Sequence, residues 1–103
     1  MQLGYSMNPA LPNNWHYVYL LRSNKTNWIY IGCTNNLFKR LGEHNKGKVY
    51  STKHRLPVEL IYYEAYTSKE SAYKREKNLK AFGSGLAKLK SRIGIVTKEG
   101  RAG

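Results

Sequence analysis

The fold is decided by the stretch YVYLLRSNKTNWIYIG, which occupies residues 17–32. Both ends of this stretch, Tyr17–Leu21 and Trp28–Gly32, are rich in aromatic and branched aliphatic residues, and a polar segment separates them. Such a pattern predicts two antiparallel strands joined by a short turn. A third strand is predicted at Val58–Tyr66, where residues of the same kind follow Pro57.

The turn of this hairpin decides which side chains face each other. A turn about Asn24 and Lys25 places Tyr19 directly opposite Tyr30, with both phenols on one face of the sheet. Tyrosine is common in strands, so the pair taken alone is more simply explained by packing than by catalysis.

Three helices are predicted around these strands. Asn35 or Asn36 can cap the first helix, which ends near residues 45–47. The segment Thr67–Glu70 has the spacing of a capping box and begins a second helix, and a short third helix covers Leu86–Ile93. The order strand, strand, helix, strand, helix, helix predicts the α/β class, with a small central three-stranded, mostly antiparallel sheet flanked by helices.

A chain of 103 residues has room for one domain with a single modest core. Residues 15–96 are predicted to form this domain, between a flexible leader at 1–14 and a flexible tail at 97–103. The first residues lack the apolar run of a secretory signal, and no stretch reaches the roughly 20 apolar residues of a membrane span. The single Cys33 favours a reducing compartment, so we expect a cytoplasmic protein that does not bind membranes.

The charge is strongly positive, with 18 Lys and Arg against 6 acids and a formal net charge of +12. This exceeds what solubility requires and indicates a polyanionic partner, of which nucleic acid is the leading candidate. A basic module that binds proteins around ribosomes or repair complexes is an alternative that charge alone leaves open. All six acids are Glu and none is Asp, so few carboxylates are available to build a two-metal site.

The first predicted helix carries two cationic or titratable residues beside its apolar stripe. Arg40 and His44 fall on one flank, next to Leu37 and Leu41, and this flank should face the edge of a groove. The simpler explanation is an arginine whose stem lies along the core and a histidine that ends the helix favourably.

Glu76 is more informative, because it falls inside the apolar face of the second helix, among Ala72, Tyr73 and Leu79. An ion pair with Lys80, four residues on, would contribute only about 0.2–0.5 kcal/mol on an exposed helix. An unpaired carboxylate moved toward a core costs several kcal/mol. A bound cation would satisfy this carboxylate better than the lysine does.

Four short blocks stand in order along the chain: YVY at 17–19, YIG at 30–32, KRLGEHN at 39–45 and AYKREK at 72–77. Together they resemble the signatures of the GIY-YIG nuclease superfamily, especially its stand-alone members similar to the N-terminal nuclease domain of the excision repair protein UvrC. The likeness extends from His16 to about Ile93 and so covers most of the predicted domain.

The resemblance implies a set of catalytic roles. Glu76 would be the sole protein ligand of one Mg²⁺ or Mn²⁺ ion, and Arg40 would hold the scissile phosphate. Tyr19 and Tyr30 would be the phenols beside the attacking water, and His44 matches a histidine that acts as general base or orients the water. A phenol has an ordinary pKa near 10 and an imidazole one near 6.5, and whether Tyr30 or His44 takes the proton stays open.

The implied function is that of a metal-dependent DNA endonuclease, which hydrolyses phosphodiester bonds by in-line attack of an activated water. We expect low sequence specificity on single-stranded, branched or duplex DNA, with selection of DNA structure in repair or recombination as one option. Two departures from the family pattern keep an alternative open: Tyr17 replaces a glycine, and Cys33 stands where UvrC-like members often carry a lysine. The alternative is a catalytically weak or inactive nucleic-acid binding module of the same fold.

The predicted DNA-binding surface centres on the segment Lys46–Arg55, which interleaves cations with hydroxyls and an aromatic ring. This composition is expected of a loop that follows a phosphate backbone and stacks a base, although a solvated charged loop would look similar. The predicted nucleic-acid contacts are Lys39, Lys46, Lys48, Tyr50, Ser51, Thr52, Lys53, His54, Arg55, Lys74 and Lys80.

Overall fold

The computed structural model describes residues 14–95. The predicted flexible leader, apart from its last residue, and the predicted flexible tail lie outside the described residues. The elements follow the predicted order: β2 (His16–Ser23), β3 (Ile29–Thr34), α1 (Leu37–Asn45), β4 (Val58–Tyr66), α2 (Lys69–Lys80) and α3 (Ser84–Arg92). The predicted α/β class, with a small antiparallel sheet flanked by helices, is confirmed.

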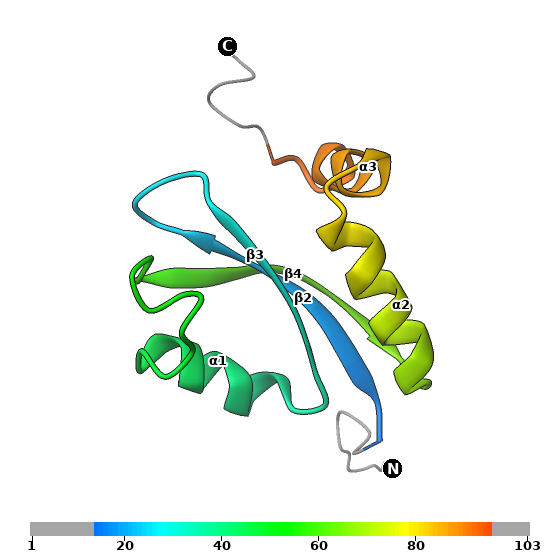
Figure 1. Cartoon of the computed structure of the whole chain (residues 1–103), viewed down its shortest axis with the longest axis horizontal. Coiled ribbons are helices and arrows are strands. Elements are labelled where there is room, and N and C mark those ends of the chain that lie inside the picture. The colour runs from blue at the N-terminus through cyan, green and yellow to red at the C-terminus, as the bar shows by residue number, and fades with distance from the viewer. Residues whose placement is uncertain (1–13, 96–103) are drawn as a thin grey trace, which may run out of the picture.

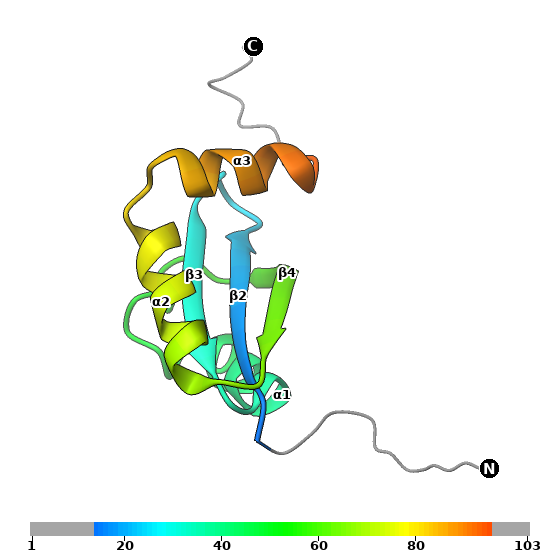
Figure 2. The same cartoon turned by 90° about the vertical axis from the view of Figure 1, so that its right-hand side faces the viewer.

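The sheet has the strand order β3-β2-β4, with both pairs antiparallel, so β2 is central and β3 lies at an edge. Figure 2 shows the three strands side by side in this order. Helix α1 covers one face, whereas α2 and α3 cover the other (Figure 1). Because β2 is covered on both faces, its residues 17–21 are all buried.

Alternation along β2 divides the core into two clusters, one on each face of the sheet. Val18 and Leu20 point toward α2 and α3, where they join a cluster that includes Leu79. The opposite cluster, on the α1 side, contains Tyr17, Tyr19 and Leu21 together with Leu37. The partly buried Tyr30 and Leu41 pack against it. The two phenols of interest therefore lie on the α1 face.

The predicted hairpin register is wrong by two residues. Tyr19 pairs with Gly32 rather than with Tyr30, which instead lies opposite Leu21. The loop centres one residue later than predicted, because Ser23 N–H donates to the carbonyl of Trp28 and closes a four-residue loop. A shift of two preserves the face of each side chain, so Tyr19 and Tyr30 remain diagonal neighbours, with ring centroids 6.2 Å apart.

The helix starts follow the cap residues closely. Asn36 caps α1, and its side chain accepts a hydrogen bond from the N–H of Lys39. Ser68 caps α2 by accepting from the N–H of Ser71, so the helix begins at Lys69 and the capping box predicted from Thr67 is displaced by one residue. Helix α3 starts slightly earlier than predicted, at Ser84.

Candidate active site

Gly32 of β3 leaves space for the rings of Tyr19 and Tyr30. A Cβ atom added to Gly32 would lie 2.5 Å from Cζ and Oη of Tyr19 and 2.8 Å from Cε2 of Tyr30. No side chain larger than a hydrogen therefore fits between the two phenols. The ring of Tyr19 starts on the central strand and passes over Gly32, so its hydroxyl reaches toward the sheet edge.

A buried chain of hydrogen bonds starts at the hydroxyl of Tyr19. This hydroxyl lies 2.8 Å from Nε2 of His44, and Nδ1 of the same ring lies 2.8 Å from Oγ1 of Thr52. The Thr52 hydroxyl donates to the carbonyl of Val49 at 3.4 Å, which leaves its oxygen free to accept from Nδ1–H. This assigns Nε2 as the acceptor, so Tyr19 donates to His44.

His44 is fully buried, and the ring of Tyr30 packs against it edge-on with centroids 5.0 Å apart. Burial lowers the pKa of His44 to about 4, and the positive charge of Arg40 acts in the same direction. Burial also raises the pKa of Tyr19 above its ordinary value, with Tyr30 and Glu76 adding to the shift and Arg40 opposing it. At neutral pH the imidazole is therefore uncharged and the proton stays on Tyr19.

Arg40 approaches this pair from α1. Its Nη1 donates to Oε1 of Glu43 at 2.9 Å, and the guanidinium is close enough to the Tyr19 hydroxyl to favour the ionised phenol. The Glu43 carboxylate raises the pKa of Arg40 further, so the guanidinium stays charged. As predicted, Arg40 and His44 share one flank of α1; His44 is buried against the Tyr19 hydroxyl, whereas the side chain of Arg40 stays 37% exposed.

Glu76 approaches from α2, on the other side of the sheet edge. Its side chain is 20% exposed, and Oε2 lies 3.0 Å from Nζ of Lys80. Its charge acts electrostatically on both the hydroxyl of Tyr19 and the thiol of Cys33, and α2 packs against β3. The helix periodicity thus located Glu76 correctly on an inward-facing side of α2.

A second carboxylate fixes α2 against the sheet. Glu64 of β4 accepts two hydrogen bonds from Arg75, at 2.9 Å from Nε and 2.8 Å from Nη2. The hydroxyls of Tyr62 and Tyr66 donate to the same carboxylate, at 2.6 and 2.5 Å. Arg75 immediately precedes Glu76, so this bidentate pair anchors to β4 the part of α2 that carries Glu76.

The side chains around Glu76 would suit a metal site with few protein ligands. Between Asn14 and Ile95, no three His, Cys or carboxylate side chains gather in a way that would hold a metal ion. Magnesium keeps most of its waters and takes one or two carboxylates together with a substrate phosphate. Glu76 is compatible with that requirement, and its pairing with a half-exposed lysine four residues on is weak enough to be exchanged for a bound cation.

The predicted DNA-binding loop is partly a structural element. Thr52 is fully buried and its hydroxyl is hydrogen-bonded with His44, so the prediction that it contacts nucleic acid directly is wrong, and it supports His44 instead. Tyr50 is exposed, and Nζ of Lys53 lies 5.0 Å from the centre of its ring. Arg55 stacks over Trp28 at 4.8 Å. Seven further predicted contacts are exposed, namely Lys39, Lys46, Lys48, Ser51, His54, Lys74 and Lys80.

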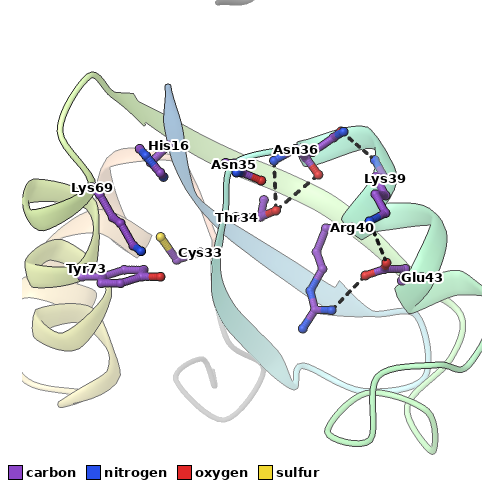
Figure 3. Close-up of a pocket in the computed structure, with 10 residues that line it drawn as sticks. All are labelled: His16, Cys33, Thr34, Asn35, Asn36, Lys39, Arg40, Glu43, Lys69 and Tyr73. Carbon is purple, nitrogen blue, oxygen red and sulfur yellow. Dashed lines mark hydrogen bonds and ion pairs between the residues drawn. The ribbon is translucent and has the colours of Figure 1, made fainter. Parts of the chain in front are cut away.

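An open pocket of about 350 Å³ lies beside Arg40, between α1 and α2 (Figure 3). Arg40 and Lys39 line one wall, Lys69 and Tyr73 line the other, and Cys33 lies between them on β3. Among the pocket residues, Lys69 and Tyr73 were not predicted as site residues. Tyr73 was expected on the apolar face of this helix, but it is 51% exposed, so that part of the prediction is wrong; Lys69 is an exposed position in the first turn.

Comparison with known families bears on this arrangement. Residues 15–83 match the family described as the GIY-YIG catalytic domain. The chain belongs to the GIY-YIG family. This family is a nuclease family, which suggests that the chain binds nucleic acid.

Relatives of this GIY-YIG protein occur among small bacterial proteins. It is 45% identical over 68 residues to a UPF0213 protein of Staphylococcus haemolyticus, covering 65% of this chain and 82% of the relative. It is 48% identical over 62 residues to a UPF0213 protein of Streptococcus pyogenes, covering 58% of this chain and 65% of the relative. The solution NMR structure of a UPF0213 protein of Bacillus halodurans has 32% sequence identity and a TM-score of 0.45, covering 74% of this chain and 85% of that one.

The helices of the GIY-YIG protein carry no sign of a transmembrane segment. Within residues 14–95, none of them is both long and apolar enough to cross a bilayer.

Proposed function

We propose that this GIY-YIG protein is a metal-dependent DNA endonuclease that hydrolyses phosphodiester bonds by in-line attack of water. The proposal is supported by the cluster of Tyr19, Tyr30 and His44 beside Arg40 on the α1 side of the sheet, with Glu76 of α2 acting electrostatically on the Tyr19 hydroxyl. Phosphoryl transfer mainly needs positioned positive charge and a route for one proton. These residues supply both.

Arg40 would hold the scissile phosphate. A guanidinium grips two phosphate oxygens with its planar fork, which a lysine cannot do. In the resting protein Glu43 occupies one side of this fork and fixes its direction. An incoming phosphate would share the guanidinium with Glu43 or displace it.

The proton route would start at Tyr30. Tyr19 and His44 are both fully buried, so neither can itself take a proton from an attacking water at the sheet edge. Tyr30 is only partly buried and packs against both rings, with centroids 6.2 Å from Tyr19 and 5.0 Å from His44. Tyr30 would therefore be the phenol that contacts the water, while the hydrogen-bonded pair of Tyr19 and His44 positions it.

Glu76 would hold a single magnesium or manganese ion. When bound, the ion would supply positive charge to the phosphate oxygens and to the leaving oxygen. Glu76 contributes one carboxylate and exchanges Lys80 for the ion, and a cation near Tyr19 would also favour ionisation of that buried phenol.

The substrate would be DNA bound largely through its phosphates. The net charge of +12 and the exposed cations of the 46–55 loop favour such binding, which weakens steeply with salt. Residues 14–95 form the six elements of this fold, without a further domain among them that could be devoted to base recognition, so we expect low sequence specificity. We also expect action in the cytoplasm.

The test is a cleavage assay with labelled single-stranded, duplex and branched DNA in magnesium or manganese. We expect cutting that chelation abolishes and that Glu76→Gln reduces by at least about 100-fold. Glu59→Gln is the matched control, because Glu59 also pairs with a cation, Arg22 at 3.0 Å, but lies at the other end of the sheet. Unimpaired cutting by Glu76→Gln would contradict the proposal.

The rival candidate is a nucleic-acid binding module without turnover. The ion pair between Glu76 and Lys80 favours it, since this pair satisfies the carboxylate without a metal. Binding of DNA without cutting of any substrate, indifferent to metal and to Glu76→Gln, would support the rival.

A further inference from the structure

The pocket between α1 and α2 opens directly beside the proposed catalytic residues, because Arg40 belongs to its wall. Figure 3 shows Arg40 and Glu43 on one side, Lys69 and Tyr73 on the other, and Cys33 between them. A chain whose phosphate lies against Arg40 would therefore enter this pocket with the next nucleotide.

The walls of the pocket offer the two kinds of contact that a nucleotide needs. Lys39 and Lys69 place ammonium groups on opposite walls, beside the guanidinium of Arg40. Glu43 is the single acid of the lining, and its carboxylate is already paired with Arg40 at 2.9 Å and with Lys39 at 3.9 Å. The lining as a whole thus favours an anion.

Tyr73 supplies an aromatic surface. It is 51% exposed, and Nζ of Lys69 lies 5.4 Å from its ring centre. The ring therefore lies on the wall of a cationic pocket with part of its surface open to solvent. Stacking of a base on such a ring tolerates any sequence, because every base has a π-face.

We propose that this pocket binds one unpaired nucleotide of the substrate, next to the cleaved phosphate. Tyr73 stacks on its base, and Lys39 and Lys69 contact the flanking phosphates. The inference rests on the proposed nuclease function and narrows its substrate class to DNA that is single-stranded at the site, such as a flap, an overhang or a single strand.

The size of the pocket supports one nucleotide rather than a duplex. Its volume of about 350 Å³ falls at the low end of the roughly 300–1,000 Å³ typical of small-molecule sites. In a continuous duplex each base is stacked on its neighbours, so a base can reach Tyr73 only after it leaves the stack, which costs energy. A base that is already unpaired enters without that cost.

The test measures DNA binding with a chelator present, so that no cutting is needed. Fluorescence anisotropy compares a labelled oligothymidylate with a labelled blunt duplex of equal length. We expect Tyr73→Ala to weaken binding of the single strand about tenfold and to change binding of the duplex less than twofold. Tyr73→Trp keeps the stacking surface and should bind the single strand as the unmodified protein does.

Tyr63→Ala is the matched control, because Tyr63 is similarly exposed, at 47%, but lies on β4 at the opposite edge of the sheet. Normal single-strand affinity in Tyr73→Ala would overturn the inference. So would an equal loss for the single strand and the duplex, or an equal loss in Tyr63→Ala. A protein that cuts DNA but shows no effect of Tyr73→Ala refutes the pocket alone, whereas Tyr73-dependent binding without any cutting refutes the nuclease function alone.

Discussion

Acidification from pH 7 to pH 5 should destabilise the protein through one buried side chain, His44. Its ring is fully buried between the hydroxyls of Tyr19 and Thr52, and its pKa is lowered to about 4. In the unfolded chain the imidazole has an ordinary pKa near 6.5. The unfolded state therefore binds a proton more readily, so the stability contributed by neutral His44 is complete above about pH 6.5 and is lost as the pH falls toward 4.

The size of the effect follows from the two pKa values. A folded pKa of about 4 against an unfolded value near 6.5 corresponds to about 3 kcal/mol once both states are protonated. Between pH 7 and pH 5 the same pair of values removes about 2 kcal/mol. The pKa values of Glu43 and Glu64 are lowered by their arginine partners. Their contribution to stability is therefore lost below pH 5 rather than between pH 7 and pH 5.

The assay is urea unfolding at pH 7, 6 and 5, with His44→Gln as the matched variant. Glutamine keeps polar atoms between Tyr19 and Thr52 but does not titrate, so the variant should start less stable at pH 7 and lose much less between pH 7 and pH 5. If the unmodified protein and His44→Gln lose stability in parallel over this range, the assignment of a buried neutral imidazole is wrong.

Other variants test the packing and the charges around the site. Gly32→Ala should destabilise the fold by about 1–3 kcal/mol in urea, because the added methyl lies 2.5 Å from the ring of Tyr19, and an unchanged midpoint would refute that close approach. Leu79→Ala, at a fully buried position, should cost about 2–5 kcal/mol in the same measurement, and a loss below 1 kcal/mol would contradict its place in the core. Lys80→Ala should lower the manganese concentration for half-maximal cutting about twofold, because it removes the competitor for Glu76, whereas a higher concentration would mean that Lys80 assists the metal.

The elements of the fold could be predicted from the sequence because each carries a local signal. Strand Val58–Tyr66 has the predicted bounds, and Asn36 caps α1 as one of the two candidates. The hairpin register was missed because a four-residue loop is held by side chains: Ser23 Oγ accepts from Lys25 N–H, and Thr26 Oγ1 accepts from Trp28 N–H. Such bonds leave no trace in the alternation of apolar residues.

Some residues of the candidate site could likewise be predicted from a local signal, and others could not. Glu76 could be located because a carboxylate on an apolar helix face stands out from its surroundings. The role of Thr52 could not, because it depends on a loop folding back over His44 eight residues earlier. Tyr73 and Lys69 join the site only because α1 and α2, which cover opposite faces of the sheet, border the same pocket, and no local pattern encodes this tertiary relation.

The central claim is that residues from two faces of the sheet act as one catalytic centre. The most direct measurement is the initial rate of DNA cutting in manganese for the unmodified protein, Tyr19→Phe, Glu76→Gln and the double variant. Residues that act as a unit are non-additive, so the double variant should be about as slow as Glu76→Gln alone. Losses that multiply in the double variant, or a rate for Glu76→Gln equal to that of the unmodified protein, would contradict a shared centre.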